Sequence, residues 1–203
     1  MEHPHGRAEK TLSRLLRGNR VARSRDLERN GIYRAELSRL VARGIVERVG
    51  RGLYALAGHE PTEHHGLVQA QQHIPNGVVC LLSALSFHGI TTQAPFEIWM
   101  AIDIHARRPR LEYPPVRIVK SSGSALSFGV EEHAIEGVQV RITTPAKTVA
   151  DCFKYRSQIG QDVAIEALRE YIGKRLGTVD TLWEAATVCR VTKIIRPYIE
   201  AQL

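Results

Sequence analysis

Residues 33–56 change from a helical to an alternating apolar pattern at one glycine, Gly44. Before Gly44, apolar residues recur at the spacing that forms one stripe on a helix, namely Tyr33, Leu37, Leu40 and Val41. After it, apolar and polar residues alternate over 45–49, and a second strand-like run, 53–56, follows the glycine-flanked turn at 50–52. The segment therefore predicts a helix followed directly by a short β-hairpin.

Two shorter helices are expected before this segment. The leucines within residues 12–16 have helical spacing, and Gly18 suits the end of that helix. Ser24 is a good N-cap for a second helix, Asp26 lies in the first turn where the helix dipole favours an anion, and Asn30-Gly31 ends the helix. Three helices and an arginine-tipped hairpin predict a winged helix-turn-helix over 1–58, whose third helix enters the major groove while the hairpin contacts the flanking backbone.

Most of the net positive charge lies in this first part of the chain. Residues 1–60 contain 13 Lys or Arg against 7 Asp or Glu, whereas residues 61–203 contain 15 against 14. Twelve of those 13 basic residues are arginines, whose forked guanidinium groups suit phosphate and guanine. We therefore expect double-stranded DNA as the partner, against the alternatives of a solvated helix surface or a protein-docking module. The face opposite the apolar stripe consists of Ala35, Ser38, Arg39, Ala42 and Arg43, with Arg34 at its border.

We expect residues 59–203 to form a second domain. For the chain as a whole, the mixture of helical and strand-like segments predicts an α+β fold. The polar, broken segment 58–62 reads as a linker, a helix is expected over 63–73, and a buried apolar segment becomes helical near Ser83. Three strand-like segments follow at 96–103, 116–121 and 130–142, the last with a hairpin turn at Glu136-Gly137. This order predicts a mixed domain with a small, largely antiparallel sheet and C-terminal helices.

Thr144-Pro145 is a strong helix start, with threonine as N-cap and proline at the first helical position. The apolar spacing at 146, 149, 150 and 153 predicts the buried face of this helix, so that Lys147, Asp151 and Lys154 form its exposed side. A lysine in the first turn opposes the helix dipole, so either another group requires it there or it is solvated and pairs with Asp151.

The sequence lacks the features of membrane, secreted and disulfide-rich proteins. There is no apolar run long enough for a membrane span, and the first residues lack the apolar stretch of a signal peptide, so we expect a cytoplasmic protein without a membrane partner. The three cysteines, Cys80, Cys152 and Cys189, form no CxxC pair and are interpreted as buried small hydrophobes.

Catalysis is not expected. The sequence contains no P-loop, GxSxG, HExxH or dinucleotide-binding glycine motif. A nuclease-like carboxylate group of Asp151, Asp162 and Glu166 is the enzymatic alternative, but Glu166 precedes Arg169 in the manner of an ordinary surface ion pair. We therefore predict a protein that is not an enzyme, without a cofactor or a metal site.

Four stretches carry a family resemblance: SRDLERNGIYRAELSRLVARGIVERVGRGLYAL, CLLSALSFHGI, RITTPAKTVADCFKYRSQIGQDVAIEAL and CRVTKIIRPYIEA. In this order they resemble the AbiEi-type antitoxins of bacterial type IV toxin–antitoxin systems. The resemblance implies an N-terminal winged helix that binds inverted repeats in its own promoter and represses the operon. It also implies a C-terminal antitoxin domain that counteracts a cognate nucleotidyltransferase toxin without a stable complex having to form.

The resemblance also suggests functional positions. For DNA it points to Tyr33, Arg34, Ser38 and Arg39 of the third helix and to Arg48 and Arg51 of the hairpin, beside Arg43 of the outward face. For antitoxin function the matching motif positions are Lys147, Asp151, Arg190, Arg196 and Tyr198. The alternative is a ligand-responsive winged-helix regulator without a toxin partner, in which residues 60–203 form a small-molecule pocket.

Overall fold

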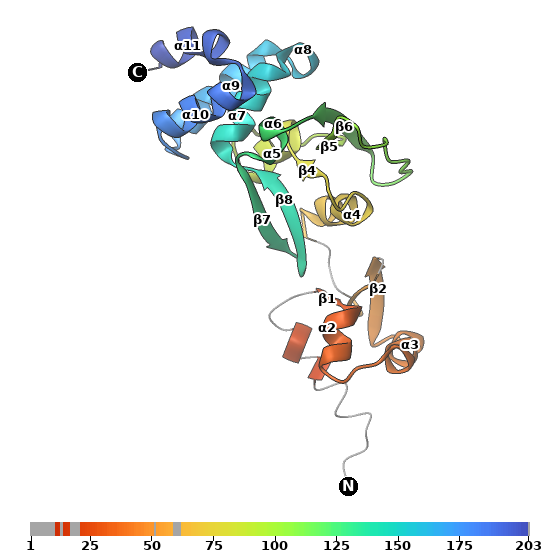
Figure 1. Ribbon diagram of the computed structural model, residues 1–203. Helices are drawn as coiled ribbons and strands as arrows, with labels where there is room; N and C mark the ends of the chain where they lie inside the picture. Colours follow the sequence, from red (N-terminus) through yellow and green to blue (C-terminus); the bar gives the residue numbers. More distant parts are fainter. Residues whose placement is uncertain (1–10, 13, 17–20, 51, 59–61, 203) are drawn as a thin grey trace. The chain divides into compact units, whose positions relative to one another are not determined.

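The computed structural model describes residues 11–12, 14–16, 21–50, 52–58 and 62–202 (Figure 1). It is an α+β structure, as predicted, and it divides into two compact units. The first unit comprises residues 1–72 together with 134–139, and the second comprises 73–133 and 140–203. The predicted linker at 58–62 falls largely on residues 59–61, which lie outside the described residues.

The first unit contains short helices and a three-stranded antiparallel sheet of order β1-β3-β2. Residues 11–12 and 14–16 are helical, in agreement with the predicted first helix, whereas its expected cap Gly18 lies outside the described residues. The remaining elements are β1 (Val21–Arg23), α2 (Ser24–Arg29), α3 (Arg34–Ala42), β2 (Val46–Gly50), β3 (Leu53–Leu56) and α4 (His65–His73), of which α4 ends in the second unit.

The core of the first unit joins all three helices to the sheet. Leu12 and Leu16 of the first helix pack with Leu27 of α2, and α3 adds Leu37 and Leu40 to the same cluster. Each of these leucines is 4% exposed or less, and burying a leucine side chain contributes about 1.5–3 kcal/mol. The cluster therefore fixes which face of α3 points inward.

Two glycines with left-handed backbone follow the ends of α2 and α3. Gly31 has φ +84° in the turn after α2, and Gly44 has φ +66° directly after the last turn of α3. There the Ile45 amide donates to the Leu40 carbonyl at 3.0 Å, which closes the helix end. The helix and hairpin predicted on either side of Gly44 are both confirmed.

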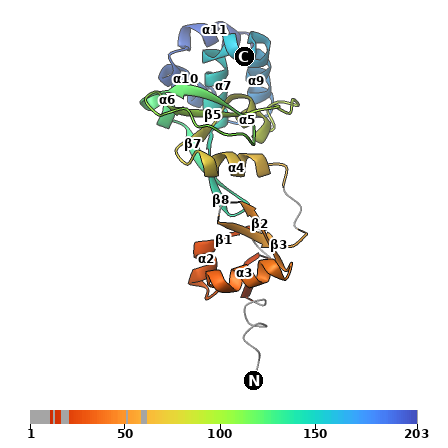
Figure 2. The ribbon, with the colours of Figure 1, turned by 90° about the vertical axis from the view of Figure 1, so that its right-hand side faces the viewer.

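The hairpin is tied to the start of α2. The Ser24 amide donates to the Gly52 carbonyl at 2.8 Å, and Ser24 is the first residue of α2 rather than its N-cap. The strand β1, which pairs with β3, was not expected because three residues are too short to display a period. Figure 2 shows α3 running beside the β2–β3 hairpin.

The second unit is built on a five-stranded sheet of order β6-β5-β4-β8-β7. Its strands are β4 (Val78–Val79), β5 (Ile98–Asp103), β6 (Val116–Ser121), β7 (Val130–Ile135) and β8 (Val138–Thr143), and the tip of the β7–β8 hairpin belongs to the first unit. The helices are α5 (Leu81–Phe87), α6 (Ser124–Ser127), α7 (Pro145–Lys154), α8 (Arg156–Ile159), α9 (Gln161–Gly173), α10 (Val179–Cys189) and α11 (Thr192–Glu200).

The expectation of a largely antiparallel sheet is wrong, because the sheet is mixed. β5 pairs with β4 in the antiparallel sense, but β5 pairs with β6 and β4 pairs with β8 in the parallel sense. The reason is the connection 104–115, which is long enough to return the chain to the start of the next strand as a parallel crossover. The predicted turn at Glu136-Gly137 is confirmed.

The helices cover the sheet from one side and share a core with it. Figures 1 and 2 both show α7, α9, α10 and α11 gathered together on that side. Val149 and Phe153 of α7 are fully buried among Leu168 of α9, Leu182 of α10 and Ile195 of α11. This core lies entirely within the second unit.

Candidate nucleic-acid interface

The outer face of α3 carries the predicted DNA-contacting side chains, and the structure leaves them in solvent. Arg34 and Arg39 have side chains 89% and 68% exposed, and Tyr33 is 68% exposed at the N-cap position. Ser38 and Arg43 are exposed as well. Because Leu37 and Leu40 are buried on the opposite side, the helix has one face in the core and one face open to solvent.

The apolar stripe is narrower than the sequence predicts. Tyr33 precedes the first helical residue and has extended backbone, so it does not reach the core. Val41 lies at the border of the stripe and is 38% exposed. The expected burial of both residues is therefore wrong, whereas the exposure of Tyr33 fits its assignment to the DNA-contacting set.

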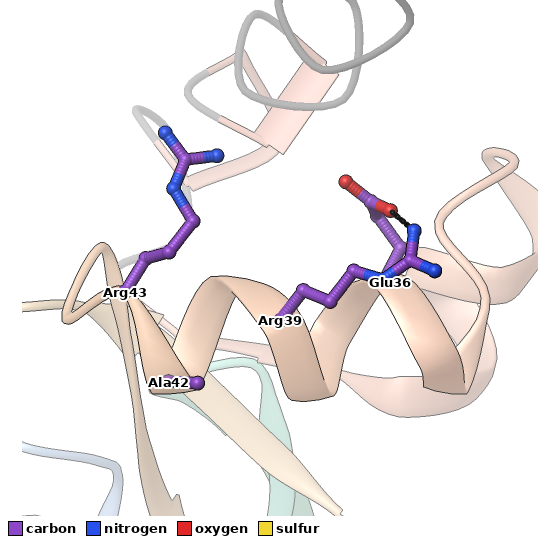
Figure 3. A pocket seen from close by; sticks show the side chains of 4 residues that line it. All are labelled: Glu36, Arg39, Ala42 and Arg43. Carbon is purple, nitrogen blue, oxygen red and sulfur yellow. Dashed lines mark hydrogen bonds and ion pairs between the residues drawn. The ribbon is translucent and has the colours of Figure 1, made fainter.

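The arginines of α3 have carboxylate neighbours that hold them only weakly. Arg39 lies 3.5 Å from Glu36, and Arg34 lies 3.4 Å from Glu28 of α2. Figure 3 shows Arg39 bent toward Glu36 while Arg43 extends away from it, on either side of Ala42. These four residues line a shallow hollow. Exposed ion pairs contribute about 0–1 kcal/mol, so a phosphate or a guanine edge can replace the carboxylate.

Glu36 is the residue that sequence reasoning missed on this face. It stands three positions before Arg39, a spacing at which side chains meet on a helix, and that spacing was the available signal. Its negative charge partly offsets the positive charge of Arg39 on this face.

The hairpin contributes one described arginine. Arg48 of β2 is exposed, and its Nε donates to the Gly50 carbonyl at 3.2 Å. A bulge between Arg48 and Gly50 shifts the pairing with β3, which twists the hairpin near its tip. Arg51 lies outside the described residues.

The positions suggested for antitoxin function differ in burial. Lys147 and Asp151 of α7 are 2% and 5% exposed, and they form an ion pair of 2.5 Å between Nζ and Oδ2. The Cys189 thiol donates to the other carboxylate oxygen, Oδ1, at 3.3 Å. The expected exposure of Lys147 and Asp151 is therefore wrong, although they do pair at i,i+4.

The burial of Lys147 comes from a segment distant in sequence. Gly129 lies so close to the first turn of α7 that a Cβ placed on it would stand 2.8 Å from Lys147 Cβ. Burial alone would lower the pKa of Lys147, but the Asp151 carboxylate outweighs it and the pKa is raised. Burial, followed by Asp151, also raises the pKa of the Cys189 thiol to about 12, so this cysteine is a protonated donor.

The other three antitoxin positions lie at or near the surface of the second unit. Arg190 is exposed at the end of α10, with left-handed backbone at φ +60°. Arg196 of α11 is exposed and lies over the Trp183 ring at 5.6 Å. Tyr198 of α11 is half-buried and packs against the Phe153 ring at 5.3 Å between centroids.

Comparison with known proteins supports the regulatory interpretation of the first part of the chain. Residues 5–57 match the family model of the AbiEi antitoxin transcriptional regulators, which confirms the predicted resemblance for that segment. No curated protein matches the chain. The match supports a DNA-binding regulator.

The fold has a relative among solved structures. The crystal structure of RV2827C protein from Mycobacterium tuberculosis has a TM-score of 0.55 to this structure, covering 98% of this chain and 80% of that chain. The two sequences are 14% identical, so the likeness concerns the fold alone. Within the described part of the chain, no helix has the length and apolarity needed to cross a membrane.

Proposed function

We propose that this protein is a DNA-binding autorepressor and antitoxin that binds inverted repeats in its own promoter and counteracts a nucleotidyltransferase toxin. The observation that carries the proposal is the exposed arginine face of α3, within the segment that matches the AbiEi antitoxin regulators. Its role is regulatory rather than enzymatic, and binding to its own promoter implies that it works in the cytoplasm.

The first unit is proposed to be a winged helix-turn-helix, with α3 as recognition helix and the β2–β3 hairpin as wing. The order of elements supports this: helical residues 11–12 and 14–16, β1, α2, α3 and then the hairpin, with β3 in the centre of the sheet. In such modules the second helix of the helix-turn-helix lies in the major groove. Tyr33, Arg34, Ser38, Arg39 and Arg43 are then the groove contacts, and Arg48 and Arg51 contact the backbone.

The antitoxin role is assigned to residues 59–203. Of its five motif positions, Lys147 and Asp151 are buried and paired, which supports a role in holding α7 in place. Arg190 and Arg196 are exposed and support a role at a working surface. Tyr198 is half-buried, packs its ring on Phe153 and accepts a hydrogen bond at its hydroxyl from Gln161 at 2.5 Å, which supports a role in packing α11.

The DNA-binding part is tested by gel shift on the region upstream of the gene. We expect binding that weakens steeply with salt, because each phosphate contact releases counterions. Arg39→Ala should weaken binding by about 1–3 kcal/mol if its guanidinium reads a base edge. Arg25→Ala on α2 removes an equal charge from an exposed position outside the proposed face and is the matched control. Equal losses from both variants would refute the placement of the DNA face.

The shape of the face is tested separately at Ala42, the small residue between Arg39 and Arg43 in Figure 3. Ala42→Glu places a negative charge where phosphates approach and should abolish binding, whereas Ala42→Gln adds similar bulk without charge and should weaken binding less. Unchanged binding by Ala42→Glu would remove this face from the interface.

A further inference from the structure

The connection between β5 and β6, residues 104–115, is a second basic segment that the proposed function does not use. Its sequence is IHARRPRLEYPP, and it lies beside the β6 edge of the five-stranded sheet (Figure 1). Arg107, Arg108 and Arg110 are exposed. None of the three guanidinium groups has a hydrogen-bond or ion-pair partner among the residues that the structure describes. Residues 61–203 as a whole contain 15 Lys or Arg against 14 Asp or Glu, so three arginines within four positions stand out locally.

The segment is anchored at both ends and stiffened in between. Lys120 of β6 donates from Nζ to the carbonyls of Asp103 and Ala106, and the Ile98 amide donates to the Pro115 carbonyl at 2.9 Å. Pro109 stands between Arg108 and Arg110 and fixes its own φ. A loop that is anchored at both ends loses less conformational entropy when it binds a ligand.

Exposed aromatic rings accompany the arginines. Tyr113 is 72% exposed near the end of the segment, and Phe96, two residues before β5, is 90% exposed. Because Ile98 bonds to Pro115, both rings lie at the same end of the sheet. Tyr113 and Arg110 also line a surface hollow together with His73, Pro109, Leu111 and Glu112.

We propose that the 104–115 segment, with Phe96, binds single-stranded nucleic acid, its arginines contacting phosphates and its aromatic rings stacking on unpaired bases. Arg110 lines the same hollow as Tyr113, and exposed guanidinium groups combined with open aromatic faces are the means by which proteins hold a single strand without reading its sequence. In a duplex the bases are already stacked on one another, so exposed rings would gain nothing there. This favours a single strand over a second duplex contact.

The test uses the full chain and a short fluorescein-labelled oligouridylate, followed by anisotropy. Arg108→Ala/Arg110→Ala should weaken binding and make the salt slope shallower by about 1.4, since each phosphate contact on a single strand contributes about 0.7. Tyr113→Ala should weaken binding at least about 5-fold through lost stacking. Glu112→Gln removes the carboxylate of the hollow and should tighten binding.

Matched controls separate this site from the α3 face. Arg169→Ala/Lys193→Ala removes two exposed charges from α9 and α11 of the same unit and should leave oligouridylate binding unchanged. Arg39→Ala/Arg43→Ala should abolish promoter binding and also leave oligouridylate binding unchanged. The proposal is overturned if the native protein does not bind oligouridylate, or if Arg169→Ala/Lys193→Ala loses as much oligouridylate affinity as Arg108→Ala/Arg110→Ala. It is also overturned if the variants of the 104–115 segment weaken only duplex binding. Thermal melting of each variant confirms that it is folded.

Discussion

Glu136 occupies a tight turn, yet its carboxylate is completely buried. It has left-handed backbone at φ +48° and accepts three hydrogen bonds, from the Thr62 amide at 2.9 Å, the Thr62 hydroxyl at 2.7 Å and His65 Nδ1 at 2.7 Å. These bonds fasten the tip of the β7–β8 hairpin to the segment that enters α4. All of these residues belong to the first unit, although they are more than 70 positions apart in sequence.

Glu136 should make stability depend on pH in the acid range. Burial alone would raise the pKa of Glu136, but the hydrogen bonds from His65 and Thr62 lower it below its ordinary value of 4.5. The unfolded chain therefore takes up the proton more readily, so this contribution is fully present above pH 4.5 and is lost as the pH falls through the folded pKa.

Glu136→Gln should reduce the free energy of unfolding by about 1–3 kcal/mol at neutral pH, because it leaves buried donors poorly paired. The difference from the native protein should shrink as the pH falls below the folded pKa. Urea unfolding followed by circular dichroism at several pH values measures both quantities. A difference that stays constant across the acid range would show that the charge of Glu136 contributes nothing.

The buried Lys147–Asp151 ion pair should also affect stability. Lys147→Met leaves the Asp151 carboxylate buried without its cation and should destabilise the protein by about 3–5 kcal/mol. Lys147→Met/Asp151→Leu removes both charges at similar volume and should recover most of that loss. Urea unfolding followed by Trp99 and Trp183 fluorescence reports on the second unit, which contains both tryptophans. A double variant no more stable than Lys147→Met would mean that the pair is not held together by charge.

Elements whose signals are local were predictable from sequence. Helix α3 and the β2–β3 hairpin follow from periodicity and from Gly44, and α7 begins at Pro145 as the Thr144-Pro145 pair predicts. Strand direction in the larger sheet was not predictable, because it depends on how far the connection 104–115 carries the chain. The burial of the Lys147–Asp151 pair was not predictable either, because Gly129 reaches Lys147 and Cys189 reaches Asp151 from other elements.

Replacing glycine by alanine should have opposite effects on stability at the ends of α3 and α9. Gly44 has φ +66°, whereas Gly173 is the last residue of α9 and lacks a positive φ, and a Cβ would meet nothing within 4 Å at either position. Gly44→Ala should therefore destabilise the first unit by about 1 kcal/mol through backbone strain alone. Gly173→Ala should stabilise the second by about 0.4–1 kcal/mol, because it restricts the unfolded chain. Thermal melting checks both, and a stabilising Gly44→Ala would contradict the left-handed helix end.

At the scale of the whole molecule, the division of the chain implies that its two proposed tasks are separable. The arginine face of α3 and the core that supports it belong to the first unit, whereas Arg190 and Arg196 belong to the second. Each unit has its own apolar core. A substitution on an exposed face of one unit should therefore leave the other unit intact.

Arg39→Ala/Arg43→Ala should abolish repression of a promoter reporter and still rescue growth when the proposed nucleotidyltransferase toxin is induced. Arg190→Glu/Arg196→Glu should do the reverse, since both side chains are exposed and their loss creates no buried defect. Expression from an inducible promoter keeps the protein level independent of its own repression, and Arg25→Ala/Arg29→Ala is the charge-matched control on α2. If the α3 variant loses both rescue and repression at an equal protein level, counteracting the toxin requires binding to DNA. The two tasks would then not be separable.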